Sequence, residues 1–227
     1  MVLRRLLFGL LLSLLGVNAA QAAAGARERC LGDTPVDVDM RIAACSALID
    51  ASSLPEEDQG IALANRGTAY LNKQYYVLAI DDYDRSEKYR ADDANILQGR
   101  CLARAVLKRD LDDALADCNR ALELQPSDPQ VLGYRGFVYL RLELNESAVT
   151  DYTAALEIEP KNALHLYGRG EAKLRGGDLQ GSAADFEAAR AINPRIAEDF
   201  AMLERDDSAW SWAALLEYWR SAMKAIY

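Results

Sequence analysis

The chain has 227 residues, and its 35 acidic side chains outnumber 26 basic ones to give a formal net charge of −9. Nucleic acids and anionic lipid surfaces bind an excess of Lys and Arg, so this balance excludes general binding to either. The acidic residues are scattered along the sequence and form no tail, which is typical of solvated helix faces.

The first 22 residues have the pattern of a cleaved secretory signal. Arg4 and Arg5 precede the apolar run LLFGLLLSLLGV, and small residues at 20–22 offer a cleavage site. The run is short for a membrane span, so a retained anchor is the less favoured alternative. We expect an exported protein with no stable membrane insertion after cleavage, periplasmic if the source is Gram-negative and otherwise secreted.

One pattern recurs four times between residues 60 and 196. In each unit, apolar and small residues recur at helical spacing along a first helix and then, after a short turn, along a second. A repeat of this length indicates stacked antiparallel helical hairpins, because each unit completes its core on its neighbours. The units are marked by Arg66, Arg100, Arg135 and Arg169, spaced 34, 35 and 34 residues apart.

Small residues and rings hold fixed places in each unit. Small residues lie on the first helix at Gly67, Cys101, Gly136 and Gly170, and on the second at Ala79, Ala114, Ala148 and Ser182; the ring positions are Tyr83, Cys118, Tyr152 and Phe186. With a proline closing most units, this pattern resembles the tetratricopeptide repeat, although the second unit has one extra residue in its KRDLD turn. The resemblance implies an all-α, right-handed superhelix with units 60–93, 94–128, 129–162 and 163–196.

Two flanks complete the predicted stack. The N-terminal arm, 23–59, contains a capping helix at Asp37–Ala51 that reads like a lone second helix. The C-terminal region, 197–227, contains a helix that either covers the last repeat, the interpretation we favour, or offers a docking surface to another protein. Its apolar stripe consists of Trp212, Leu215, Leu216, Trp219, Met223 and Ile226.

Four cysteines in an exported chain suggest two disulfides, for which three connectivities exist. Cys101 and Cys118 occupy facing positions of the second unit, so a bond between them is reasonable, and Cys30 with Cys45 would then pin the arm to its helix. Redox catalysis would favour a CxxC pair and zinc a ligand cluster, and the sequence has neither. We interpret the single histidine, His165, as a surface residue, and we expect no metal or cofactor.

One arginine and one aspartate also recur in every unit. We expect ion pairs within about 4 Å that specify the register of the helices more than they add stability. The pairs are Arg66 with Asp82, Arg100 with Asp117, Arg135 with Asp151, and Arg169 with Asp185.

The resemblance places the first helices on a concave surface that suits an extended peptide or a partner's helix. Some proteins of this family grip a partner's C-terminal carboxylate there, but the aligned positions here (Ala64, Thr68, Gly99, Gln130 and Tyr134) lack the charged donors, so that mode is not expected. Each groove candidate either contacts a partner or packs on the neighbouring hairpin. The candidates are Asn65, Thr68, Asn72, Gln98, Leu102, Tyr134, Phe137, Arg141, Tyr167 and Glu171.

No Ser-His-Asp set or other catalytic arrangement can be assembled, so we expect no enzyme. The sequence favours a non-catalytic protein–protein interaction module of the bacterial cell envelope: a scaffold, adaptor or chaperone-like assembly factor that binds a protein or peptide in its groove. The alternatives are an accessory subunit of an envelope enzyme and a small-ligand or cell-wall-glycan binder. The last would use Tyr134, Phe137 and Tyr167 as a stacking platform.

Overall fold

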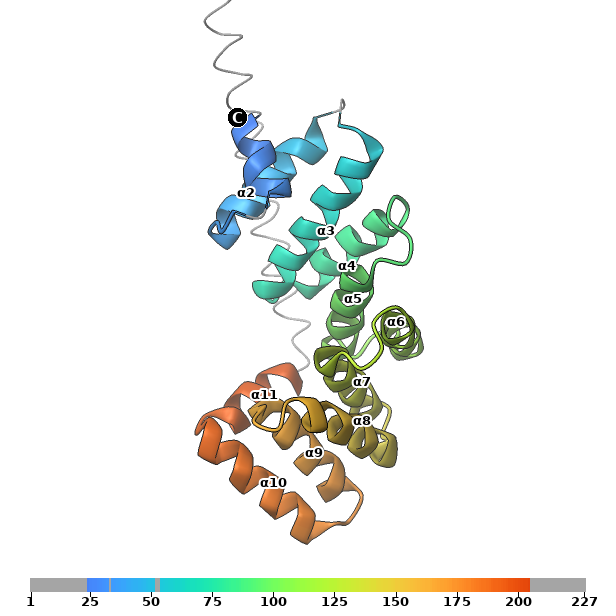
Figure 1. Ribbon diagram of the computed structural model, residues 1–227, viewed down its shortest axis with the longest axis vertical. Coiled ribbons are helices and arrows are strands. Elements are labelled where there is room, and N and C mark those ends of the chain that lie inside the picture. The colour runs from blue at the N-terminus through green and yellow to red at the C-terminus, as the bar shows by residue number, and fades with distance from the viewer. Residues whose placement is uncertain (1–23, 33, 52–53, 205–227) are drawn as a thin grey trace, which may run out of the picture.

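The computed structural model describes residues 24–32, 34–51 and 54–204, and this part of the chain is all-α (Figure 1). Among the helices of these ranges, none has the length and hydrophobicity that a membrane-spanning segment requires. A short helix at 24–31 comes first. It is followed by α2 (Val38–Asp50), α3 (Glu56–Asn72), α4 (Tyr76–Glu87), α5 (Ala94–Val106), α6 (Leu111–Leu124), α7 (Pro129–Arg141), α8 (Asn145–Ile158), α9 (Ala163–Arg175), α10 (Leu179–Ile192) and α11 (Ile196–Glu204).

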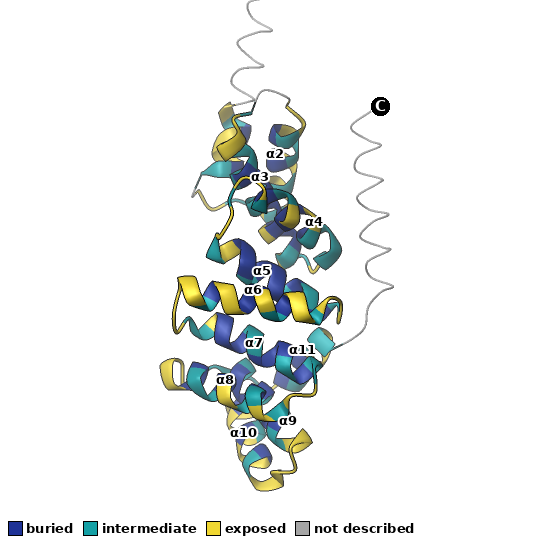
Figure 2. Ribbon diagram, turned by 90° about the vertical axis from the view of Figure 1, so that its right-hand side faces the viewer, coloured by how far each residue is buried: buried dark blue, intermediate teal, exposed yellow. Residues whose placement is uncertain are grey.

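The helices pair as four antiparallel hairpins, α3 with α4, α5 with α6, α7 with α8, and α9 with α10. Each first helix also contacts the next first helix, so α3, α5, α7 and α9 form a continuous row. Figure 2 shows that α5 and α7 are largely buried, whereas α6 exposes its outer side. This arrangement confirms the predicted all-α stack of hairpins. The first hairpin begins at Glu56, where α3 starts.

Capping residues and left-handed turns set the helix boundaries. The side chains of Asp93, Asp128 and Asn162 accept backbone N–H groups at the starts of α5, α7 and α9. The extra residue of the second unit is absorbed in its turn, where Lys108 and Asp110 both have positive φ. Every other unit places a single residue with positive φ in the same turn: Gln74, Glu143 and Gly177.

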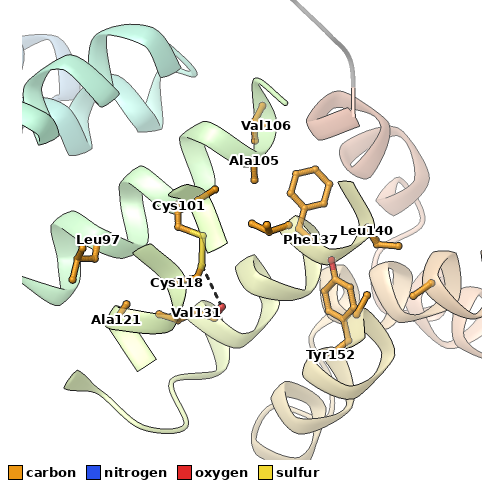
Figure 3. Packing of buried hydrophobic residues seen from close by; sticks show 14 of the residues in the cluster. Leu97, Cys101, Ala105, Val106, Cys118, Ala121, Val131, Phe137, Leu140 and Tyr152 are labelled. Atoms are coloured by element: carbon orange, nitrogen blue, oxygen red, sulfur yellow. Dashed lines mark hydrogen bonds between the residues drawn. A yellow bond between two sulfur atoms is a disulfide. The ribbon is translucent and has the colours of Figure 1, made fainter. Parts of the chain in front are cut away.

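Two disulfides join the predicted partners, Cys30 with Cys45 and Cys101 with Cys118. The second bond spans 5.6 Å between Cα atoms and lies inside the central core beside Leu97 and Val131 (Figure 3). The first bond ties the helix at 24–31 to α2, which confirms the expected capping helix at this end. The predicted tryptophan helix near the C-terminus lies outside the described residues.

The four predicted ion pairs form. Each arginine donates through Nε and Nη2 to both oxygens of its aspartate, at 2.6–2.9 Å. Through Nη1 the same guanidinium reaches the second helix of the preceding hairpin, or α2 in the first unit. The Nη1 acceptors are Ser46 for Arg66, Asp84 and Glu87 for Arg100, Asn119 for Arg135 and Thr153 for Arg169.

The carboxylates of these pairs respond differently to burial. Burial raises the pKa of the Asp82 carboxyl, and hydrogen bonding and charge from Arg66 oppose that rise. Burial also acts on Asp185, but hydrogen bonds from Arg169 and Lys173 outweigh it and lower the pKa of that carboxyl. A carboxylate buried as deeply as Asp82 therefore depends on its arginine to remain charged.

Removing one partner of the Arg66–Asp82 pair tests this dependence. We expect Arg66→Met to lower the free energy of unfolding by about 3 kcal/mol, because Asp82 must then either hold a buried charge without this partner or take up a proton. The double variant Arg66→Met with Asp82→Leu removes both charges and should recover most of the loss. Urea unfolding followed by circular dichroism measures both, and a double variant no more stable than the single one would contradict this account.

Candidate functional site

The helix α11 divides the concave face of the stack. It lies against α9 and reaches α7, so it covers the C-terminal half of the row of first helices (Figures 1 and 2). The N-terminal half, formed by α3, α5 and the start of α7, carries a hollow of about 410 Å³. The candidate groove residues therefore fall into two groups with different surroundings.

We call the open half the amide hollow, because five side-chain carboxamides line it together with hydroxyl and apolar groups. The carboxamides are Asn65, Asn72, Asn95, Gln98 and Gln130, and the hydroxyls are those of Thr68, Tyr83 and Tyr134. Five of the groove candidates lie here: Asn65, Thr68, Asn72, Gln98 and Tyr134. Leu102 is half-buried against the central core and does not line the hollow.

Several hydrogen bonds of the amide hollow join its polar groups to one another, whereas Asn65 Nδ2 donates to the Cys30 carbonyl at 2.7 Å. Gln130 Nε2 donates to Tyr134 Oη at 2.7 Å, and Gln98 Nε2 donates to Asn95 Oδ1 at 3.2 Å. Burial raises the pKa of Tyr134, so its hydroxyl stays protonated near neutral pH. The charged residues in the lining, Arg90 and Asp93, pair with each other at 2.7 Å. The surface is thus neutral and offers both donors and acceptors.

A smaller hollow of about 210 Å³ adjoins the amide hollow. Both are lined by Asn65, Thr68 and Asn72 of α3, so they lie on one continuous surface. The smaller hollow adds Arg41 of α2 and the N-terminal arm at Val36. Sequence reasoning missed this part, because Arg41 lies outside the four repeats and no repeated position marks it.

Tyr134 lies in the amide hollow because the preceding unit has Cys118 where other units have an aromatic ring. At the equivalent position in the neighbouring units, a Cβ on Gly99 would lie 2.4 Å from the Tyr83 hydroxyl, and one on Gly168 would lie 2.4 Å from the Tyr152 ring. The second unit has the smaller Cys118 in place of such a ring, which leaves room for the Tyr134 side chain. The disulfide and the groove tyrosine are therefore sterically linked.

The C-terminal half of the groove is filled by the chain itself. Of the two alternatives for the groove candidate Phe137, partner contact or packing, the structure shows packing: the residue is only 3% exposed, and its ring meets Phe200 of α11 edge-to-face at 5.8 Å. Tyr167 is also occupied, with its ring 5.1 Å from Phe200 and 4.7 Å from Phe186. Figure 3 shows the Phe137 side chain beside α11.

Two arginines of this half, the groove candidate Arg141 and also Arg175, hold α11 in place. Arg141 donates to the backbone carbonyls of Leu203 at 2.6 Å and Glu204 at 3.3 Å. Arg175 binds Glu204 Oε1 at 2.6 Å and also lies 3.8 Å from Glu171. Cations suit this position because the carbonyls at a helix C-terminus carry partial negative charge.

Sequence reasoning did not identify α11 as a separate helix, although its signal is present. Ile196, Phe200 and Leu203 follow one another at spacings of four and three residues, which is the pattern of an apolar helix face. Ile196 and Phe200 are buried. What the pattern alone does not show is that this face turns back onto α7 and α9.

The interpretation of His165 as a surface residue is wrong. Its side chain is buried and packs against Gly133. A Cβ atom added to that glycine would lie only 2.3 Å from His165 Nε2, so the imidazole occupies the space of the missing side chain. It occupies the place of Ile96 and Val131 in the preceding units, which are also buried. Within the described residues its Nδ1 has no hydrogen-bond partner. A missing side chain at Gly133 provides the space, so the histidine serves as a packing residue.

Comparison with known proteins agrees with this architecture. A family model described as "Tetratricopeptide repeat" matches residues 131–162, most of the third unit. The third unit thus matches the tetratricopeptide repeat in sequence, and the stacked helical hairpins of the described residues share the fold of such proteins. No curated protein sequence matches it.

Solved structures of MamA share the arrangement. MamA from Desulfovibrio magneticus RS-1 superimposes with a TM-score of 0.63 and 17% identity, over 77% of this chain and 95% of that one. MamA AMB-1 gives 0.59 and 14% identity, over 84% and 100%. At these identities the likeness is one of fold.

Truncating Phe200 tests how α11 is held. We expect Phe200→Ala to weaken the free energy with which α11 docks on α7 and α9 by about 3 kcal/mol, because the ring is buried between Phe137 and Tyr167. Hydrogen exchange of 196–204 should accelerate while α3 to α8 stay protected. Met202→Ala is the control, since that side chain is 47% exposed. Equal exchange in the two variants would show that Phe200 does not anchor the helix.

His165 gives the stability a pH dependence. Burial lowers the pKa of its imidazole, so the unfolded chain takes up the proton more readily than the folded one. The stabilisation is complete above the ordinary histidine pKa of about 6.5 and is lost as the pH falls below it. We expect the urea midpoint to drop between about pH 7.5 and about pH 5.5. His165→Leu should flatten this slope, and an unchanged slope would assign it to other groups.

Proposed function

We propose that this protein is a non-catalytic binding module of the bacterial cell envelope that holds an extended segment of another protein in the amide hollow. The observation that carries the proposal is the open, neutral, carboxamide-rich surface across α3, α5 and α7. Its role would be that of a scaffold, adaptor or chaperone-like assembly factor. The tetratricopeptide fold supports a protein partner, since stacked hairpins present such surfaces.

The chemistry of the amide hollow suits a peptide backbone. An extended segment presents N–H donors and C=O acceptors in alternation, and a side-chain carboxamide can satisfy either. Gln98 and Gln130 lie on consecutive first helices, so they can contact successive parts of one segment. Ordering such a segment costs entropy, and a rigid helical surface limits that cost to the ligand.

Two further observations support an envelope location. The pattern of residues 1–22 is that of a secretory signal. Two disulfides are also consistent with an oxidising compartment, where such bonds persist.

The glycan-binding alternative loses its main support. It depended on Tyr134, Phe137 and Tyr167 acting as one stacking platform. Phe137 is buried beneath α11, and Tyr167 is packed between Phe186 and Phe200. Of these three residues, Tyr134 is the one that lines the open half, so the three rings do not present a shared face to a sugar.

Selection of short random peptides on the immobilised chain tests the proposal. Peptides enriched on the native chain should bind about tenfold to thirtyfold more weakly to Gln98→Ala combined with Gln130→Ala, because two hydrogen bonds of about 1 kcal/mol each are lost. Fluorescence polarisation with synthetic peptides gives the affinities.

The matched control is Gln125→Ala combined with Gln180→Ala. These glutamines are exposed at the end of α6 and on α10, away from the hollow. The control variant should bind as the native chain does. Failure to enrich any peptide, or an equal loss of affinity in the two variants, would contradict peptide binding in the amide hollow.

A further inference from the structure

Arg41 brings a positive charge to the end of the groove, and no carboxylate of the described residues compensates it. Its Nη1 donates to the carbonyls of Cys30 and Gly32, both at 3.4 Å, and its Nη2 donates to the carbonyl of Thr34 at 3.1 Å. These acceptors are all neutral. Among the described residues, no carboxylate lies within ion-pair distance of this guanidinium, although it lines the smaller hollow.

Arg41 and Arg90 both line this surface, but they differ in whether a carboxylate pairs with them. Arg90 lines the amide hollow too, but Asp93 neutralises it at 2.7 Å. Arg41 is half-buried and held by three carbonyls, so its position is fixed while its charge remains available. A guanidinium has five N–H donors in a planar fork, and carbonyl contacts to two of its nitrogens leave others for a ligand.

Geometry connects this charge to the amide hollow. The two hollows share Asn65, Thr68 and Asn72 along α3. An extended segment advances about 3.3 Å per residue, so one that lies over Gln98 and continues along α3 reaches Arg41 within a few residues. A carboxylate at that point would meet the guanidinium with Asn65 and Asn72 beside it.

We propose that the bound segment carries one aspartate or glutamate side chain that pairs with Arg41, followed along the groove by uncharged residues. This inference rests on the proposed peptide binding in the amide hollow. The rest of the molecule limits the acidity of the ligand: the chain has a net charge of −9, and the neighbouring depression near Glu56 and Glu57 is lined by four acidic and two basic residues. The single charge selects a register, and additional carboxylates are repelled.

The test is a selection of random peptides on the native chain, on Arg41→Gln and on Arg41→Glu. On the native chain, enriched peptides should share one Asp or Glu at a fixed distance from their uncharged part. That preference should disappear on Arg41→Gln and become a preference for Lys or Arg on Arg41→Glu. Synthetic peptides with amidated C-termini keep the carboxylate on the side chain, and an Asp→Asn exchange in them should weaken native binding about tenfold or more.

Two controls separate binding from folding. Arg41→Lys retains the charge and should retain the acidic preference, and helicity and the Cys30–Cys45 bond should be unchanged in every variant. Arg27→Gln removes a nearby arginine that is paired with Asp58 and should leave the selected sequences unchanged.

The possible failures are distinguishable. Enriched peptides that bind through Gln98 and Gln130 but show no acidic residue, or an acidic residue that persists on Arg41→Gln, overturn the role of Arg41 and leave the proposed function intact. An absence of enriched peptides on the native chain overturns both.

Discussion

The structure depends on an arginine–aspartate pair that is repeated in each hairpin and joins three helices. The carboxylate takes two hydrogen bonds from its own unit's arginine, and the remaining nitrogen of that arginine binds the preceding helix. A buried ion pair repays its desolvation only when its hydrogen bonds are nearly complete, and here they are. Because the arginine lies on the first helix, the pair fixes the rotation of each first helix against its neighbours, and with it the side chains that face the groove.

Sequence periodicity predicted the elements that repeat. The hairpins, the ion pairs and the disulfide of the second unit could be predicted because each unit supplies an independent copy of the same constraint. The burial of Phe137 and His165 could not be predicted in this way, since it depends on contacts that are not repeated between units. Phe137 is covered by Phe200, which lies 63 residues later, and His165 fills space beside a glycine on another helix. A helical pattern identifies an apolar face, but it does not name the surface that the face will cover.

The departures from the repeat form a connected set. Replacing a ring with Cys118 permits the disulfide to Cys101, which supplies covalently the closure that a ring and a glycine give elsewhere. The smaller side chain also admits Tyr134 at a position where Gly99 and Gly168 tolerate no Cβ. An unusual core residue therefore becomes visible at the surface as a groove tyrosine. Substituting either cysteine would change the amide hollow as well as the core.

The division of the concave face follows from its chemistry. The C-terminal half presents the rings of Phe137 and Tyr167, and an open apolar groove of this kind would favour association with other chains. The protein covers it with α11, held by Arg141 and Arg175. The N-terminal half presents carboxamides, which remain hydrated without such cost. The polar half therefore needs no helix to cover it. A ligand that bound there would have to replace water through directional hydrogen bonds, and this favours a peptide backbone with a single well-placed charge.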